Sequence, residues 1–328
     1  MGDSKVVRSC ILCGAKDGVP MFTYTYDFLT NVRGHPPEEL ERTGWTKDTT
    51  STIVKCGACS CIYVRDVVVW PESFRRLRSE EWRTAEAAEE LARTTMAARA
   101  TYKNYRALDN ENWVIRNLVW LAADFFERDI KFLDFGAGGG TSSNAARVYG
   151  VRDVIAYDPN YIDSIQTHFD RTSHPGIRCV RSKDELPELG PFDAAVFQSA
   201  VEHVLDPRAE LKTIYDNMSE GGYLYVNNPF MDLENEIGEL CAATRIEKRD
   251  SISHYHAGHL NYMTPMEFSR LLREVGFRIT PLLHYPPIPL TWRHLGRYLI
   301  RNMKFGVRMT QNILGIPYHR FFFIVRKP

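Results

Sequence analysis

The sequence lacks an excess of charge of either sign, a long apolar run and any internal repeat. Its 41 Lys and Arg residues balance its 41 Asp and Glu residues, so no bulk positive field draws the chain to nucleic acid or an anionic membrane. No segment approaches a membrane-spanning length, and the first thirty residues hold no apolar stretch typical of a signal peptide. We therefore expect a cytoplasmic protein without stable membrane insertion, whose partner is a small molecule and not nucleic acid.

Cysteine is scarce outside the N-terminal region. Five of the seven cysteines lie in the first 61 residues, among them the pairs Cys10-x-x-Cys13 and Cys56-x-x-Cys59. Two such pairs are typical of a structural site in which four thiolates hold a tetrahedral zinc ion. Zinc binding would supply stability that this segment, broken by Gly and Pro, cannot obtain from a core of its own. Cys61 is the alternative to Cys59 as the fourth ligand.

Composition divides the chain into three parts. Residues 1–70 form the expected zinc-binding module, and residues 71–128, rich in Glu, Arg, Ala and Leu, predict a helical connector or lid. In residues 129–328, strand-like and helix-like segments alternate, which predicts a parallel sheet covered by helices on both faces. Two insertions interrupt this third part, at residues 229–262 and 289–316.

The alternation gives specific boundaries for strands and helices. Strands are expected at residues 130–135, 153–157, 177–181, 192–198, 222–227, 277–283 and 319–326. Helices are expected near residues 141–149, 160–170, 207–219 and 265–275. The last helix has a start signal at Thr264-Pro265 and a stop signal at Gly276.

A glycine-rich loop follows the first strong strand of the third part. Gly136, Gly138 and Gly140 lie directly between that strand and a helix, where glycine lets the backbone turn sharply and approach a ligand closely. Asp158 ends the next strand, where its carboxylate could accept both hydroxyls of a ribose. Together they predict a nucleoside-cofactor site. NAD is disfavoured, because Thr141 stands where a dinucleotide site has Gly or Ala.

These motifs resemble those of a known enzyme family. The spacing D-x-G-x-G-x-G from Asp134 to Gly140, followed by Asp158, resembles the first two motifs of the Rossmann-like (class I) S-adenosylmethionine-dependent methyltransferases. The segment Glu-His-x-x-Asp-Pro at residues 202–207 resembles the loop after their fourth strand, and the similarity covers roughly residues 100–328. The resemblance implies a seven-stranded α/β methyltransferase sheet with S-adenosylmethionine (SAM) as the cofactor.

The same resemblance implies roles for residues of the cofactor site. It places Asp134 near the amino group of SAM, the three loop glycines along its methionine portion, and Asp158 on its ribose. The other cofactor contacts that we expect are Ser182, Asp184, Gln198 and Tyr105.

Methyl transfer to oxygen or carbon requires alignment of the acceptor and a base that removes its proton. His203 is the expected general base, with Glu202 beside it, because an unperturbed histidine titrates near neutrality. The alternative is a structural histidine near the start of the next helix. His259 is expected to contact the acceptor or to act as a second base. A metal site formed with His254 and His256 is the alternative for that residue.

The loop with Glu202 and His203 also resembles that of the deoxysugar C-methyltransferases, which carry an N-terminal zinc module. In those enzymes a base takes a proton beside a sugar ketone, and the enolate attacks the methyl group. A tyrosine usual in their loop is Ala200 here, so O-methylation of a hydroxyl fits at least as well. We therefore predict methylation of a sugar, a nucleotide-linked sugar or a related natural product.

Two other functions compete with this prediction. An RNA or protein methyltransferase would use the zinc module to bind a macromolecule, but the zero net charge disfavours RNA. A catalytically inactive binding module would keep the glycine loop as a scaffold, which the intact loop with Asp158 disfavours. The basic insertion 289–316 has three interpretations beside a simple solvated face: a cover for the acceptor site, a homodimer contact and a membrane-surface contact.

Overall fold

A computed structural model of the 328-residue chain gives the fold. It describes residues 5–32, 36–42, 44–68, 130–138, 140–148, 151–159, 177–229, 259–279 and 320–328. The expected connector at 71–128 with Tyr105, the helix expected at 160–170 and the insertion 289–316 lie outside the described residues, as do His254 and His256.

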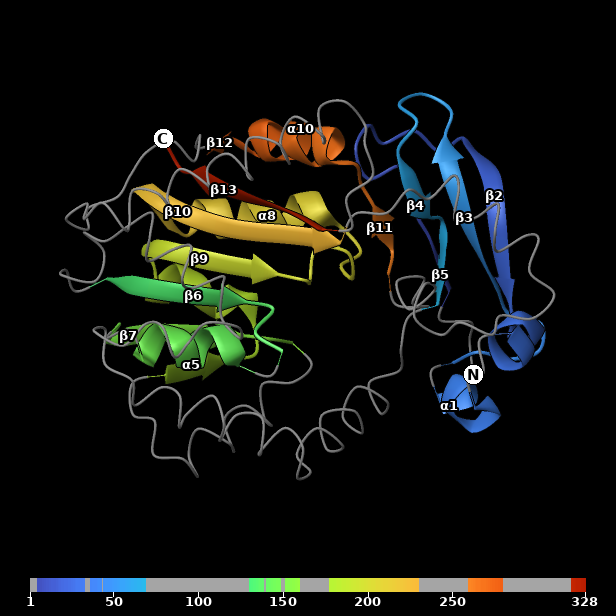
Figure 1. Cartoon of the computed structure of the whole chain (residues 1–328), viewed down its shortest axis with the longest axis horizontal. Helices are drawn as coiled ribbons and strands as arrows, with labels where there is room; N and C mark the ends of the chain where they lie inside the picture. Colours follow the sequence, from blue (N-terminus) through green and yellow to red (C-terminus); the bar gives the residue numbers. More distant parts are fainter. Residues whose placement is uncertain are drawn as a thin grey trace, which may run out of the picture.

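Within the described residues, the larger sheet has seven strands in the order β12-β13-β10-β9-β6-β7-β8 (Figure 1). The strands are β6 (Lys131–Phe135), β7 (Asp153–Tyr157), β8 (Ile177–Val180), β9 (Phe192–Gln198), β10 (Met218–Pro229), β12 (Arg278–Ile279) and β13 (Arg320–Arg326). Strands β8, β7, β6, β9 and β10 run parallel, whereas β13 is antiparallel to both of its neighbours. The expected seven-stranded α/β sheet is confirmed, with one reversed strand near its edge.

The helices beside this sheet are η4 (Lys183–Glu185), α5 (Thr141–Val148), α7 (Leu186–Leu189), α8 (Pro207–Asp216) and α10 (Pro265–Val275). Asp206 and Thr264 cap the starts of α8 and α10 with their side-chain oxygens, and Gly276 ends α10 at a φ of 119°. Figure 1 shows α5 and α8 on opposite faces of the sheet. In the part of the chain that the structure describes, no helix has the length and apolar character needed to cross a membrane.

Two smaller sheets form the N-terminal part of the chain (Figure 1). Their N-terminal strands are β1 (Lys5–Val7), β2 (Gly18–Thr25), β3 (Thr50–Cys56), β4 (Ile62–Val64) and β5 (Asp66–Val68), with α1 (Pro37–Arg42) and the π-helix η1 (Phe28–Val32) between them. Strand β1 pairs with β5, and β2, β3 and β4 form an antiparallel sheet. A fourth strand, β11 (Asn261–Tyr262), joins that sheet beside β4. The sequence predicted only a connection at 229–262, so this strand is a finding of the structure.

The N-terminal part lies beside the carboxyl ends of the parallel strands of the larger sheet. In Figure 1 the arrowheads of β6 and β9 point toward it. Side chains of both parts share one hydrophobic cluster, in which Cys10 and Tyr63 are grouped with Val201, Met263 and Phe268. Ligands of open α/β sheets bind outside the carboxyl ends of the strands. The N-terminal part therefore borders the region where a ligand is expected.

Candidate active site and cysteine cluster

The glycine loop turns directly off the end of β6. Gly136, Gly138 and Gly140 have φ angles of 73°, 51° and 74°, in the left-handed region that other residues rarely adopt. A Cβ added to Gly136 would lie 3.0 Å from the Cβ of Ala200, so the loop packs closely against the segment after β9. A Cβ added to Gly138 would meet nothing within 4 Å. The loop is thus closely packed at one glycine and accessible at the other.

Asp158 follows the last residue of β7 and contacts this loop. Its Oδ2 accepts a hydrogen bond from the Gly138 N–H at 2.9 Å, and the residue is buried. The N–H groups of Gly136 and Ala137 both donate to the carbonyl of Tyr157, at 2.8 and 3.0 Å. The loop and the carboxylate expected to bind a ribose therefore form one unit at the ends of two neighbouring strands.

Asp134 lies on β6, and its carboxylate is directed at the first turn of α5. Its Oδ2 accepts hydrogen bonds from the Ser143 N–H at 2.8 Å and from the Ser143 hydroxyl at 2.7 Å. Burial raises the pKa of Asp134 to about 6, and the charge of Asp158 acts in the same direction, while the two hydrogen bonds from Ser143 oppose the rise. The side chain joins the strand before the glycine loop to the helix after it.

Three other expected cofactor contacts lie at or after the ends of two strands. Gln198 ends β9, and its Oε1 accepts from the hydroxyl of Ser142 at the start of α5, at 3.4 Å. Ser182 and Asp184 follow β8, where the Ser182 hydroxyl caps η4 by accepting from the Asp184 N–H at 3.2 Å. Gln198 is thus connected to the helix that follows the glycine loop. Ser182 and Asp184 lie after β8, the strand next to β7.

Glu202, His203 and His259 come together after the carboxyl end of β9. The ring centroids of the two histidines lie 4.7 Å apart, and His203 Nε2 lies 3.9 Å from Glu202 Oε1. The side chain of Glu202 is 3% exposed and that of His203 is 44% exposed. One ring nitrogen of each histidine and one carboxylate oxygen of Glu202 lie within 4.8 Å of one another. Such a group could move a proton or hold a divalent metal.

Two residues beside this trio have no counterpart in the sequence analysis. Asn261 and Arg8 are both buried and hydrogen-bond to each other, and Asn261 also bonds to the backbone on either side of Glu202 and His203. Their sequence signal is a lone polar residue inside an apolar stretch: Asn261 stands between Leu260 and Tyr262, and Arg8 follows two valines.

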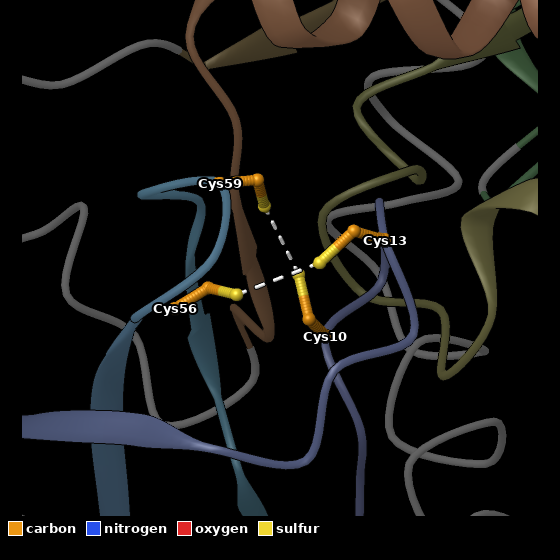
Figure 2. Close-up of side chains that lie close together, drawn as sticks. All are labelled: Cys10, Cys13, Cys56 and Cys59. Carbon is orange, nitrogen blue, oxygen red and sulfur yellow. Dashed lines mark hydrogen bonds between the residues drawn. The ribbon is translucent and has the colours of Figure 1, made fainter.

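The four cysteines of the two C-x-x-C pairs converge on one point (Figure 2). The sulfurs of Cys10 and Cys59 lie 3.5 Å apart, and those of Cys13 and Cys56 lie 3.6 Å apart. In a tetrahedral site with Zn–S bonds of about 2.3 Å, neighbouring sulfurs are about 3.8 Å apart. Cys61 is buried outside this set of four, and its hydrogen bond is the main cause that lowers the pKa of Cys10 to about 4. The donor set therefore fits zinc, with Cys59 as its fourth member.

The glycine loop and Asp158 lie within a segment that matches a known protein family. Residues 104–282, more than half of the chain, match the family described as methyltransferase domain. The chain belongs to this family. It is therefore a SAM-dependent methyltransferase, as its sequence motifs predict. No curated protein matches the sequence.

Several solved methyltransferase structures are similar to the chain. Magnesium protoporphyrin IX methyltransferase from Synechocystis PCC 6803, with bound S-adenosylhomocysteine (SAH), is 13% identical, with a TM-score of 0.42, and the match covers 68% of this chain and 85% of that one. A SAM-dependent methyltransferase from Archaeoglobus fulgidus is 17% identical, with a TM-score of 0.40, over 69% and 99% of the two chains. One from Mesorhizobium loti is 17% identical, with a TM-score of 0.37, over 63% and 97%.

The buried carboxylate of Asp134 predicts a pH dependence of stability. In the native protein Asp134 keeps its proton up to about pH 6, whereas the unfolded chain releases it near pH 3.8. Between these values the native state holds more protons, so its free energy of unfolding falls as the pH rises, by roughly 1.4 kcal/mol per unit of pKa difference. Asp134→Asn is expected to remove this part of the pH dependence, as measured by urea unfolding at about pH 4.5 and about pH 7.

Asp153→Asn is the matched control, because it removes an exposed carboxylate from the neighbouring strand β7. From about pH 4.5 to about pH 7, the free energy of unfolding of the wild type should fall relative to that of Asp134→Asn. Relative to that of Asp153→Asn it should not change. A free-energy difference between wild type and Asp134→Asn that is the same at both values would contradict the prediction.

Proposed function

We propose that the protein transfers the methyl group of SAM to an oxygen or carbon atom of a sugar, a nucleotide-linked sugar or a related small natural product, with His203 as the general base. The observation that carries the proposal is the grouping of His203 with Glu202 and His259. Glu202 and His203 lie in the segment after β9, and Ala200 in the same segment packs against Gly136 of the glycine loop. The proposed base and the proposed cofactor loop are thus neighbours.

The residues of the glycine loop fit SAM, because the backbone at Gly138 leaves space that a side chain would fill. When bound, SAM supplies a methyl group attached to a positively charged sulfur. We assign the ribose to Asp158, the methionine portion to the loop glycines and its amino group to Asp134. The remaining contacts are assigned to Gln198, Ser182, Asp184 and Tyr105.

In the proposed reaction, His203 takes the proton from the acceptor as the acceptor atom is methylated. Its imidazole gains a positive charge in this step, and the Glu202 carboxylate 3.9 Å away stabilises that charge. Because Nε2 is the ring nitrogen nearer Glu202, we assign the acceptor proton to Nδ1. His259, whose ring lies edge-on to that of His203, limits the rotation of His203 and contacts the acceptor.

We assign a structural zinc ion to Cys10, Cys13, Cys56 and Cys59. Four thiolates complete a tetrahedral site and leave no position for a substrate or a reactive water. These four cysteines form no disulfide, which suits a reducing compartment, and we propose that the enzyme acts in the cytoplasm without a nucleic-acid partner. A homodimer contact through residues 289–316 also stays a proposal, on a segment outside the described residues.

The zinc assignment predicts which cysteines retain the metal. Purified wild-type protein should contain about one equivalent of zinc by plasma mass spectrometry. Cys59→Ser should lose most of it, because serine is a poor zinc ligand, whereas Cys61→Ser, which changes a buried neighbour outside the set of four, should keep it. A wild-type protein without zinc, or loss in Cys61→Ser alone, would refute the assignment.

The acceptor class is tested by following the methyl group. The protein is incubated with methyl-labelled SAM and one candidate acceptor at a time. The acceptors are nucleotide-linked sugars, free sugars, total RNA and a mixture of unfolded proteins. We expect label in a sugar fraction, because the neutral chain offers no positive field for RNA. Label that appears only in RNA or protein would favour a macromolecular acceptor and overturn the proposal.

With an acceptor from that panel, His203→Ala should lower kcat by about 100-fold or more, the usual range for loss of a general base. SAH affinity, measured by calorimetry, should stay within about threefold, since the substitution lies outside the glycine loop. Lys212→Ala, on the exposed face of α8, is the control and should match the wild type. Normal turnover in His203→Ala would remove this residue from the mechanism. A rate that depends on added Mg²⁺ or Mn²⁺ and loses this dependence in His203→Gln would assign the trio to a metal instead.

A further inference from the structure

Asn261 is a buried polar residue on β11, the strand that joins the N-terminal sheet from the C-terminal half of the chain. It is 1% exposed, and its neighbours Leu260, Tyr262 and Met263 are buried as well. A buried carboxamide needs hydrogen-bond partners for its oxygen and its nitrogen. Here the nitrogen Nδ2 donates to the carbonyls of Val201 and Val204, at 2.8 Å each.

These two carbonyls bracket Glu202 and His203. The carbonyl between them, that of Glu202, accepts from the Leu260 N–H at 2.6 Å and from the Asn261 N–H at 3.2 Å. The turn that carries the proposed base is therefore held at three carbonyls by the segment around Asn261. A change in these bonds would move the backbone from which the His203 side chain projects.

Arg8 determines which way the carboxamide of Asn261 points. Its Nη2 donates to Asn261 Oδ1 at 2.5 Å, and its Nη1 donates to the carbonyls of Val64 and Leu260 at 3.1 and 3.2 Å. A guanidinium can donate but not accept, so it fixes the oxygen of the carboxamide on its own side. The nitrogen is thereby directed at the turn.

The N-terminal module in turn holds Arg8. The Arg8 N–H donates to the carbonyl of Arg65 at 2.8 Å, and the residue lies two positions before Cys10 of the cysteine cluster. The two-residue step along the chain from Cys10 to Arg8, and the hydrogen bonds from Arg8 to Asn261 and from Asn261 to the turn, thus connect the cysteine cluster to the backbone on either side of His203.

We propose that Asn261, oriented by Arg8, is a positioning residue for the turn that carries Glu202 and His203, through which the N-terminal module sets the geometry of the proposed base. The proposal rests on the proposed function only in taking His203 as that base. Neither Asn261 nor Arg8 is assigned a contact with SAM or with the acceptor. Both are expected to affect the orientation of His203 and to leave cofactor binding intact.

Two substitutions test separately the bonds from Asn261 to the turn and the bond from Arg8 to Asn261. Asn261→Asp keeps an oxygen for Arg8 but turns a second oxygen toward the carbonyls of Val201 and Val204, where the donor is lost. Arg8→Lys keeps the charge but loses the planar fork that reaches several oxygens. Asn217→Asp is the matched control, because its Nδ2 donates to a backbone carbonyl at the end of α8, away from the turn.

The test observes the histidines directly and needs no acceptor. Protein labelled with carbon-13 at histidine Cε1 gives signals from which His203 and His259 are assigned by their loss in His203→Gln and His259→Gln. In the wild type we expect a cross-peak between the two rings, whose centroids lie 4.7 Å apart. In Asn261→Asp and Arg8→Lys we expect the intensity of that cross-peak to fall by at least about half and the His203 signal to shift. Zinc content should match that of the wild type, and SAH affinity should stay within about threefold.

Unchanged histidine signals in both variants would overturn the proposal. Loss of zinc or of SAH binding together with the shift would also overturn it, because the residues would then support the whole fold. Asn261→Ser, which keeps one donor, is expected to give an intermediate shift. It serves as the second variant if Asn261→Asp does not fold, and a wild-type spectrum from it counts against the proposal.

Turnover adds a second measurement with any acceptor from the panel. Asn261→Asp should lower kcat by about 10- to 100-fold, with little change in the KM for SAM, the size of effect expected when a reacting group is misplaced by about 1 Å. In a His203→Ala background the same substitution should have no further effect on kcat. Failure of the proposed function is recognised separately, because it appears as normal turnover of His203→Ala, whereas the labelled spectra report only on the turn.

Discussion

A buried carboxamide joins the two sheet systems of this methyltransferase. Asn261 belongs to the N-terminal sheet through β11, yet its side-chain nitrogen is bonded to the turn after β9 of the larger sheet. Leaving a buried polar group without its partner costs roughly 1–3 kcal/mol. The network therefore favours one arrangement of the turn relative to the module. The region at the carboxyl ends of the parallel strands is thus formed by residues of both the larger sheet and the N-terminal sheet.

The two ends of the proposed site are supported in different ways. On the cofactor side, Asp134 and Asp158 are bonded to groups close to them in the chain or on the adjacent strand, namely Ser143 and Gly138. On the acceptor side, the turn with His203 depends on residues far away in the sequence. Local support suits a cofactor common to a whole family, whereas remote support lets the acceptor side differ from one enzyme to the next.

The sequence predicted the larger sheet well, because each of its strands carries its own pattern. The bounds of β7 and β9 agree with the prediction residue for residue, and so do those of α10, which has a capping Thr264 and a terminal Gly276. β11 was missed, because a strand of two residues has no pattern of its own and exists only through its pairing with β4. Its neighbours in the chain gave no sign of the N-terminal sheet.

In the candidate site, too, features with a local sequence pattern were predicted and features formed by packing were not. The glycine loop and the cysteine pairs were predictable, since their chemistry depends on spacing along the chain. Which fourth cysteine joins the cluster depends on side-chain direction, and spacing alone left Cys59 and Cys61 open. The contact of His203 with His259 and the hydrogen bonds of Asn261 depend on packing between segments that are distant in sequence, so no local pattern contains them.

The contact of Arg8 with Asn261 spans 253 positions of the chain. A ribosome therefore releases the N-terminal strands long before their last partner exists. Until β11 is made, β4 is an edge strand, and its unpaired backbone groups can bond to another chain. During synthesis this edge is a point at which a chaperone or a misassembled neighbour can act.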